Sequence, residues 1–337
     1  MDKLLIICGP TATGKTKLGI SLAKEFNGEI VSADSRQVYR GMDVGTGKDL
    51  GESTIYNVQF TIKDFRIGYY KIDGVKVWLL DVVNPDYKFN VADYKKCADL
   101  VIDDILRRGK LPIVVGGTGF YIKAVLEGIG TMGIEPDWEL RERLSHCSIA
   151  SLLEILTKLD PERIQRMSES DRKNPRRLIR AIEIARKGKG QSAKCKVTVE
   201  SSKLDTLFIG LTAPNKILYK KIDQRVEERM NMGLEDEIRG LLAKGYNFAN
   251  SALGTTLAYR EWQEYFEGKK TKDEVIQNWK FDEHEYSRRQ MTWFRRDSRI
   301  NWFDITDETF REKVEKLVGN WYIDSKSTYQ QNSKREW

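Results

Sequence analysis

The stretch GPTATGKT, Gly9 to Thr16, has the spacing G-x-x-x-x-G-K-[ST] and could bind phosphate. An apolar run, LLIIC, precedes it and predicts a buried strand, and helical periodicity follows. In such a strand, loop and helix unit, backbone amides surround an anion, Lys15 adds charge and Thr16 can bind Mg²⁺. Whether the anion is ATP or another diphosphate stays open at this point. The residues expected to hold it are Gly9, Pro10, Thr11, Ala12, Thr13, Gly14, Lys15 and Thr16.

A carboxylate follows the second predicted strand, EIVSAD, which ends at Asp34. In an open parallel sheet the loops at the carboxyl ends of the strands meet at the ligand, so we expect Asp34 beside the phosphate loop, as a base or a metal-organising group. The alternative is that Asp34 caps a helix beginning at Ser35. Asp81, at the end of VWLLD, looks like a Walker B carboxylate, and Thr118 in VVGGTGF is the polar residue expected to face the site.

These residues need a sheet to position them. Short apolar runs alternate with helical patterns in the first third of the chain, which is typical of βαβ units on a parallel sheet. Two alternating runs, YNVQFTIKDF and YYKIDGVKV, predict a β-hairpin at one edge of that sheet. The expected parallel strands are LLIIC, EIVSAD, VWLLDV, LPIVVGG and TLFIGL.

Composition changes near Gly133, after which helical patterns and basic residues dominate until strand character resumes at TLFIGL. We therefore expect an α/β fold with a P-loop core, residues 1–133 and 205–322, interrupted by a helical insertion at 134–204. The polar residues 323–337 are predicted to form a disordered tail.

Charge and cysteine content limit the classes of partner. The 337-residue chain has a formal net charge of +7, which suits a polyanionic partner. Its four cysteines form no CxxC pair and it has two histidines, so neither a zinc site nor a disulfide framework is expected. It lacks an apolar run long enough to span a membrane. We expect a cytoplasmic, monomeric protein with no membrane partner.

The motifs resemble one family, the bacterial-type tRNA dimethylallyltransferases, also called tRNA isopentenyltransferases. The resemblance covers nearly the whole chain, in order, through GPTATGKT, SADSRQVYRGMDVGTGK, FNVADY, LPIVVGGTGFYIKAVLEG, NPRRLIRAIEI, IDQRVEERMNMGL and RRQMTWFRRD. It implies transfer of a dimethylallyl group from dimethylallyl diphosphate to the N6 amine of the adenine 3′-adjacent to the anticodon, tRNA position 37. Diphosphate would be released, Mg²⁺ would assist, and the insertion would grip the anticodon stem.

The resemblance also implies a role for each matching residue. Thr11 to Thr16 would hold the donor diphosphate with Thr16 near Mg²⁺, Asp34 would act on the adenine amine, and Arg225 would reach the donor phosphates. The implied catalytic residues are Asp34, Thr11 and Arg225. The implied tRNA contacts are Asp34, Ser35, Arg36, Gln37, Thr118, Arg141, Arg176, Arg177, Leu178, Ile179 and Arg180.

Several of these residues have a plainer interpretation. The arginines of NPRRLIRAIEI could form a solvated basic helix face instead of contacting phosphates. Arg225 could form a surface ion pair with Glu227 or Glu228. Trp293 and Phe294 are interpreted as core anchors, and the arginines around them as candidates to line the RNA side.

Other functions share the same loop. An isopentenyltransferase acting on AMP, ADP or ATP is the runner-up, followed by an ATP-dependent small-molecule kinase and a non-catalytic RNA-binding module. The basic insertion favours a macromolecular acceptor. The chain departs from the family pattern at Gly47, at Ala258, at Lys76 and Val77, and at Glu283 and His284.

Overall fold

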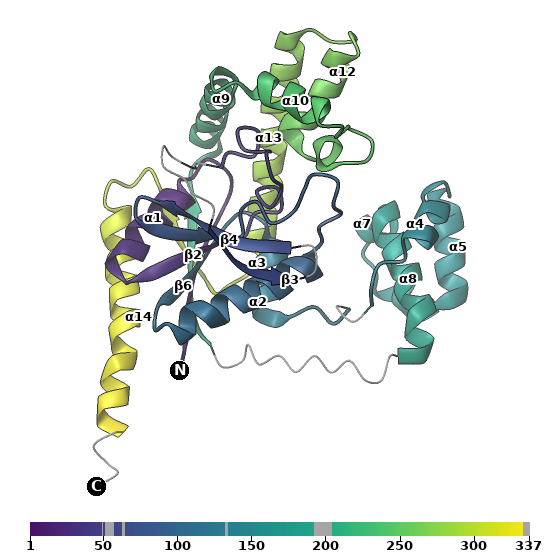
Figure 1. Ribbon diagram of the computed structural model, residues 1–337. Helices are drawn as coiled ribbons and strands as arrows, with labels where there is room; N and C mark the ends of the chain where they lie inside the picture. Colours follow the sequence, from purple (N-terminus) through teal and green to yellow (C-terminus); the bar gives the residue numbers. More distant parts are fainter. Residues whose placement is uncertain (49, 51–56, 63–64, 132–133, 192–203, 333–337) are drawn as a thin grey trace. The chain divides into compact units, whose positions relative to one another are not determined.

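The computed structural model describes residues 1–48, 50, 57–62, 65–131, 134–191 and 204–332 (Figure 1). The chain divides into two compact units. The first, which we call the core unit, is Met1–Leu126 with Ser201–Trp337, and the second, the helical unit, is Glu127–Glu200. The sequence placed these two boundaries at 133/134 and 204/205.

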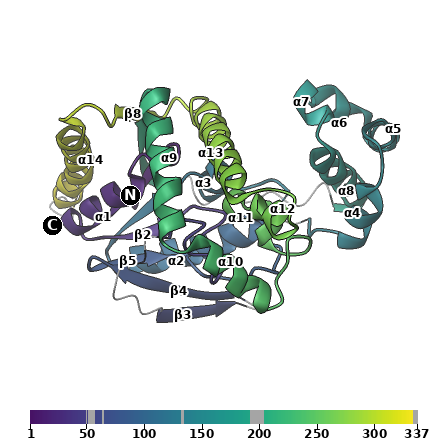
Figure 2. The same cartoon turned by 90° about the horizontal axis from the view of Figure 1, so that it is seen from above.

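The core unit contains a mixed sheet in the order β3-β4-β5-β2-β6-β1-β7-β8 (Figure 2). Neighbours from β5 to β8 pair in parallel, whereas β3 with β4 and β4 with β5 are antiparallel. The predicted α/β fold is therefore confirmed. The strands are β1 Lys3–Cys8, β2 Gly28–Ser32, β3 Asn57–Ile62, β4 Phe65–Ile72, β5 Val75–Trp78, β6 Leu111–Val115, β7 Asp205–Thr212 and β8 Ile300–Asp304.

The antiparallel edge differs in detail from the prediction. The run YYKIDGVKV contains a turn at Asp73 and Gly74, both with positive φ, so it contributes to two strands, β4 and β5. The strand expected at VWLLDV ends at Trp78, because Leu79 and Asp81 adopt φ of 65° and 54°. These positive φ values take the chain out of the extended conformation that a strand requires.

Helices cover both faces of the sheet, which explains why every residue of β1 is buried. One face packs against α1 (Lys15–Glu25) and α14 (Phe310–Asn332), with Leu18, Leu22, Val314 and Val318 in one apolar cluster. The other face packs against α2 (Val91–Arg107) and α3 (Gly119–Glu127). Helix α14 continues to Asn332, so the tail predicted to be disordered is helical to that point, and 333–337 lie outside the described residues.

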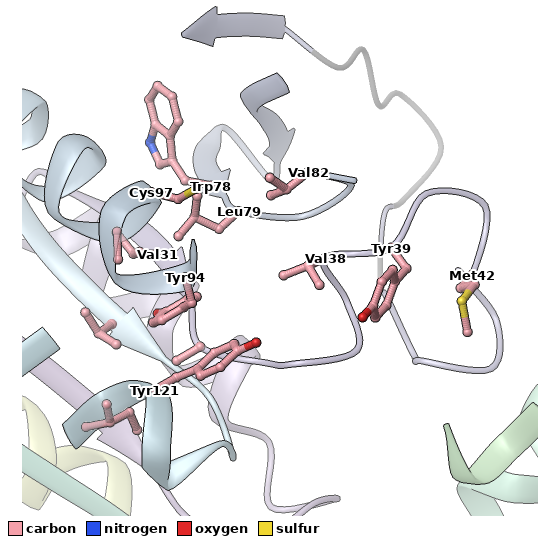
Figure 3. Packing of buried hydrophobic residues seen from close by; sticks show 14 of the residues in the cluster. Val31, Val38, Tyr39, Met42, Trp78, Leu79, Val82, Tyr94, Cys97 and Tyr121 are labelled. Carbon is pink, nitrogen blue, oxygen red and sulfur yellow. The ribbon is translucent and has the colours of Figure 1, made fainter. Parts of the chain in front are cut away.

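The α2 face also anchors the loop after β2. Tyr94 of α2 stacks on Tyr121 of α3, with ring centroids 3.9 Å apart and planes 11° apart. Figure 3 shows these rings beside Val31 of β2, together with Val38 and other apolar residues of the following loop. Because these side chains are buried, they fix the position of the loop that carries Asp34, which follows the carboxyl end of β2.

The remaining helices of the core unit follow β7. In the part of the chain that the structure describes, no helix is long and apolar enough to cross a membrane. The longest inner helix, α13, begins with a capping box between Thr271 and Glu274. The elements are α9 Asn215–Asn231, α10 Leu234–Ala243, the 3₁₀ turn Ala252–Thr255, α11 Leu257–Arg260, α12 Trp262–Phe266 and α13 Lys272–Phe294.

The helical unit has its own apolar core. Leucines from α4 and α5 pack against α8, with Leu152, Leu156 and Leu178 fully buried. The pattern of buried residues every three or four positions is typical of packed amphipathic helices. Its helices are α4 Trp138–Ser145, α5 Ile149–Leu159, α6 Pro161–Arg166, α7 Glu169–Arg172 and α8 Pro175–Gln191.

Candidate active site

A cavity of about 700 Å³ opens at the carboxyl ends of the parallel strands, and every residue that lines it belongs to the core unit. The phosphate loop, the loop after β2, the end of β6, and helices α9 and α13 all contribute to its wall. Its charged lining is strongly basic, with nine lysines and arginines against three acidic residues. Such a cavity favours a ligand with several negative charges.

The phosphate loop is shaped before any ligand binds. Gly9 has a φ of 135°, and a Cβ there would lie 2.3 Å from the carbonyl oxygen of Leu211. Thr13 Oγ1 and Lys15 Nζ both donate to the carbonyl oxygen of Pro10, at 2.9 and 2.6 Å. Gly14 caps α1 in a left-handed conformation without a side-chain hydrogen bond. The amides of the first turn of α1 are thus left for an anion.

The eight loop residues divide into two groups. Gly9, Pro10 and Thr13 are buried and support the turn. The five that line the cavity are Thr11, Ala12, Gly14, Lys15 and Thr16.

Lys15 is the cation at the centre of this loop. Burial and then the neighbouring charge of Arg225 lower its pKa to about 8, although Asp34 acts in the opposite direction. A lysine with a lowered pKa holds its proton less firmly until an anion arrives beside it. An anion bound beside Lys15 would therefore be stabilised by its ammonium group.

Asp34 lies where the sequence predicted, on the same cavity as the phosphate loop. Its Oδ1 atom accepts from the backbone amides of Arg36 at 2.8 Å and Gln37 at 3.4 Å. The chain forms turns here, so the alternative of a helix beginning at Ser35 is wrong. Because both bonds go to Oδ1, Oδ2 is the oxygen that can accept a proton from a ligand.

The neighbours of Asp34 are held in place by hydrogen bonds. Thr118 Oγ1 accepts from the amide of Ser35 at 3.1 Å, and Arg36 donates to Thr255 Oγ1 at 3.0 Å. Gln37 Nε2 donates to the carbonyl oxygen of Gly47 at 3.1 Å. The three residues after Asp34 line the cavity with it.

Arg225 points from α9 toward the phosphate loop. Its two terminal nitrogens donate to Thr11 Oγ1 and to the carbonyl oxygen of Gly47, both at 3.3 Å. The alternative partners are engaged elsewhere: Glu227 pairs with Lys280, and Glu228 accepts from Gln224. Arg225 therefore contacts the phosphate loop instead of forming the alternative surface ion pair, and its reach to the donor phosphates stays a prediction.

Arg229, one turn further along α9, is a residue that the sequence reasoning missed. It donates to the carbonyl oxygen of Gly45 at 3.3 Å and lies 3.7 Å from Glu283. Burial and then the charge of Arg225 lower its pKa to about 10. A Cβ on Gly47 would lie 2.2 Å from Arg229 and 2.3 Å from Arg225. Glycine at this departure from the family pattern lets both guanidinium groups approach.

Gln290 of α13 is a second missed residue. Its Oε1 accepts from the amide of Thr11 at 2.9 Å, and its Nε2 donates to the carbonyl oxygen of Gly117 at 3.0 Å. It is 6% exposed. A Cβ on Gly117 would lie 2.1 Å from that nitrogen. Gln290 therefore joins the phosphate loop to the end of β6, and only its place inside the motif RRQMTWFRRD could have drawn attention to it.

Asp81 is not an open Walker B carboxylate. Lys48 Nζ bonds to its Oδ1, and the hydroxyl of Tyr70 donates to its Oδ2. The same ammonium also donates to Asp43 and to the carbonyl oxygen of Tyr39. Asp81 thus stabilises the loop after β2 from behind the cavity.

The predicted residues of the helical unit have mixed environments. Leu178 and Ile179 are buried in its core. Arg141 and Arg180 both bond to the fully buried carboxylate of Glu183. Burial raises the pKa of Glu183, but the hydrogen bonds from Arg141, the amide of Asp137 and Arg180 outweigh it and hold the pKa below its usual range.

The other two arginines of this segment face solvent. Arg176 is exposed, and Arg177 is exposed and paired with Asp171. Of the arginines expected to contact phosphate, these two present their side chains most openly.

A glycine-rich phosphate loop, a largely parallel sheet and a basic cavity that Asp34 lines together have the features of a P-loop fold with a phosphate-binding site. The model of the IPP transferase family matches residues 37–297, and that of the isopentenyl transferases matches residues 2–62. The chain belongs to the IPP transferase family.

Relatives match over almost the whole chain. A tRNA dimethylallyltransferase of Pediococcus pentosaceus is 39% identical over 327 residues, covering 95% of this chain and 97% of the relative. The structure of the full-length tRNA isopentenylpyrophosphate transferase of Bacillus halodurans matches with a TM-score of 0.66 and 33% identity, covering 98% of this chain and 100% of that one. A eukaryotic dimethylallyltransferase acting on tRNA shares the fold, with a TM-score of 0.75 and 24% identity over 96% of this chain and 80% of that one.

Proposed function

We propose that the protein transfers the dimethylallyl group of dimethylallyl diphosphate to the N6 amine of adenine 37 in tRNA and releases diphosphate. The observation that carries this proposal is the shared cavity, which the phosphate loop and Asp34 both line. The tRNA dimethylallyltransferases that match the chain over its length support it. Because the acceptor is tRNA, the reaction belongs in the cytoplasm.

Dimethylallyl diphosphate has a charged part and an apolar part, and the cavity lining includes residues suited to each. The amides at the start of α1, Lys15 and Arg225 would hold the diphosphate and stabilise the charge that develops as it leaves. An isoprenoid chain also needs apolar wall, since water would hydrolyse an allylic, cation-like transition state. The lining includes five aliphatic core side chains, Ile30, Ile72, Val77, Leu80 and Val115.

Asp34 would serve as the general base. The N6 nitrogen forms a bond to C1 of the dimethylallyl group while the bond from C1 to the diphosphate oxygen breaks, and the diphosphate leaves with that electron pair. The proton of N6 passes to Oδ2 of Asp34. An adenine amine is a weak nucleophile, so a carboxylate that accepts its proton as the new bond forms lowers the barrier.

Mg²⁺ is proposed as the cofactor, and the donor set can be compared with its needs. Among the described residues, no group of three or more histidine, cysteine, aspartate or glutamate side chains could hold a metal ion. Thr16 supplies a hydroxyl at the open start of α1. This fits Mg²⁺, which usually binds through substrate phosphates and water with few protein ligands. The ion would neutralise phosphate charge there.

The tRNA is proposed to contact both units. Ser35, Arg36, Gln37 and Thr118 lie on the core unit beside Asp34, where an unpaired loop adenine could enter. Arg176 and Arg177 present exposed charge on the helical unit, suited to phosphates of the anticodon stem. A loop base costs less to extract than a paired one.

One experiment tests the acceptor. Purified protein with Mg²⁺ and labelled dimethylallyl diphosphate is offered unmodified tRNA, or the same tRNA with purine, which lacks the exocyclic amine, at position 37. We expect label in the first tRNA and none in the second. Equal labelling of both tRNAs would exclude N6 as the acceptor. No transfer to tRNA or to a free nucleotide would favour the alternative in which the phosphate loop binds ATP.

A second arm addresses the adenylate isopentenyltransferase alternative. The isopentenyl transferase match to residues 2–62 covers the phosphate loop and Asp34, which an enzyme acting on free nucleotides would share. AMP, ADP and ATP are therefore offered in place of tRNA. Transfer to a nucleotide without transfer to tRNA would establish that alternative.

A further inference from the structure

Two aromatic side chains of the core unit are exposed side by side. Trp293 on α13 is 40% exposed and Phe120 on α3 is 45% exposed. Their ring centroids lie 6.3 Å apart with planes at 70°, an edge-to-face pair. Phe294 is buried at 3%, so the sequence-based interpretation of both residues as core anchors is correct for Phe294 and wrong for Trp293.

This aromatic pair lies next to the active site along two elements. Three residues at helical spacing on α13 lie against three consecutive positions, the last two residues of the loop after β6 and the first residue of α3. Tyr286 lies beside Thr118, Gln290 bonds to Gly117, and the edge of Trp293 lies against Gly119, where a Cβ would be 2.1 Å from Cδ1 of the indole. Thr118 in turn bonds to the amide of Ser35, beside Asp34. The aromatic pair is therefore adjacent, along α13 and α3, to the residues that position the loop of Asp34, the proposed base.

The charge around the pair is positive. Arg289 precedes Trp293 by one helical turn, is exposed and lines the cavity. Arg296 and Lys123 are also exposed, each three residues after one of the two aromatic residues. Exposed aromatic rings among cations are the composition of a surface that binds single-stranded nucleic acid. An apolar protein partner would have to cover these charges.

We propose that the Phe120–Trp293 pair is a stacking site for a nucleobase that flanks the target adenine in the anticodon loop. The proposal rests on the proposed function, in that it takes tRNA as the acceptor. When the adenine leaves its stack, its neighbour loses the face on which it was stacked. The exposed indole would replace that face. Arg289, which lines the cavity, and Arg296, which is also exposed, would contact the adjoining phosphates.

The test measures binding of a fluorescently labelled anticodon stem-loop RNA by anisotropy, which needs no turnover. Trp293→Ala is expected to raise the Kd about 5- to 150-fold, the range for loss of one stacked base, and Trp293→Phe to retain most of the affinity. The KM for dimethylallyl diphosphate stays unchanged. Phe281→Ala is the matched control, because Phe281 is on the same helix and is 63% exposed, and it should leave the Kd unchanged.

Abasic RNAs identify the base. The same loop is prepared without the base on the 5′ side of the adenine, or without the base on its 3′ side. With one of these two RNAs, wild type and Trp293→Ala should bind equally, because the stacking partner is already gone. An equal fold-loss by Trp293→Ala on all three RNAs, or no loss on any, overturns the stacking site.

A second variant and the behaviour of wild type separate failure of the stacking site from failure of the proposed function. Phe120→Ala removes the other ring and is expected to show the same dependence on the abasic RNAs, so the test does not depend on the folding of Trp293→Ala alone. Wild type that binds the RNA but transfers nothing to it would contradict the proposed function and leave the binding comparison intact. Wild type that fails to bind the RNA would contradict both proposals.

Discussion

The core unit and the helical unit both concentrate arginine, but the arginines have different partners. In the core unit, Arg225 donates to the neutral backbone carbonyl of Gly47 beside the cavity, and Arg229 donates to that of Gly45 and lies 3.7 Å from Glu283. In the helical unit, Arg141 and Arg180 bond to the buried carboxylate of Glu183.

The difference decides which charges can serve a ligand. An arginine held by a carbonyl keeps its charge for an incoming anion, whereas Arg141 and Arg180 share one buried carboxylate, which offsets part of their charge and ties both side chains to the fold. Burial and then the charge of Arg225 lower the pKa values of both Lys15 and Arg229, so these buried cations gain from a bound anion. The cavity of the core unit therefore favours a diphosphate. In the helical unit, Arg141, Arg177 and Arg180, three of the four arginines expected to contact tRNA, each pair with an acidic side chain.

The largest effect is expected at Asp34, which separates chemistry from binding. Asp34→Asn should lower turnover by about 10²- to 10⁴-fold, because an amide cannot accept the proton of N6. The Kd for tRNA should stay within a few-fold. Single-turnover transfer and RNA binding are measured side by side. Asp223→Asn is the control, since Asp223 of α9 is not among the residues that line the cavity and bonds to His284 of α13. A variant with full turnover would remove Asp34 from the mechanism.

The next effect tests the structural half of the comparison. Glu183→Ala leaves Arg141 and Arg180 without their common carboxylate, and breaking a partly buried ion cluster costs about 3 kcal/mol or more. We expect the helical unit of this variant to unfold at a lower denaturant concentration or temperature than in wild type. Circular dichroism measures the transition. Glu142→Ala, at an exposed position on α4, is the control. If Glu183→Ala unfolds like wild type but binds tRNA poorly, the two arginines act on RNA after all.

These particular residues show what sequence patterns can predict. The phosphate loop and the parallel strands follow from local signals: glycine spacing, apolar runs and the helical periodicity between them. Asp34 could be placed beside the loop because strand ends converge in this kind of sheet. The family resemblance added Arg225, whose contact with Thr11 joins residues 214 positions apart.

The missed features depend on contacts that no local pattern contains. Gln290 bonds to residues 279 and 173 positions away, and Arg141 meets Glu183 across 42 positions. The early end of β5 depends on positive φ at Leu79 and Asp81, which neither residue type predicts. Similarly, Trp293 and Phe294 differ in exposure only because α13 turns one toward Gly119 and the other into the core.

A smaller effect is expected on the pH dependence of diphosphate binding in the core unit. Lys15 has a pKa of about 8 in the free protein, and a bound anion favours its protonated form. Diphosphate affinity should therefore be constant below about pH 7 and fall as pH rises through 8, by about tenfold up to pH 9. Isothermal titration calorimetry measures it. Lys15→Arg keeps its charge throughout this range, so any change it shares with wild type belongs to titration of the ligand.

The smallest effect is expected on the exposed arginines of the helical unit, where the comparison leaves charge free for RNA. Arg176→Ala should weaken tRNA binding roughly threefold and lower the slope of log K against log salt by about one, as for loss of one phosphate contact. Lys158→Ala is the control, since Lys158 is exposed on α5 and paired with Glu154. An unchanged salt slope for Arg176→Ala would mean that this face of α8 is only a solvated basic surface, and that the helical unit contacts RNA through other residues.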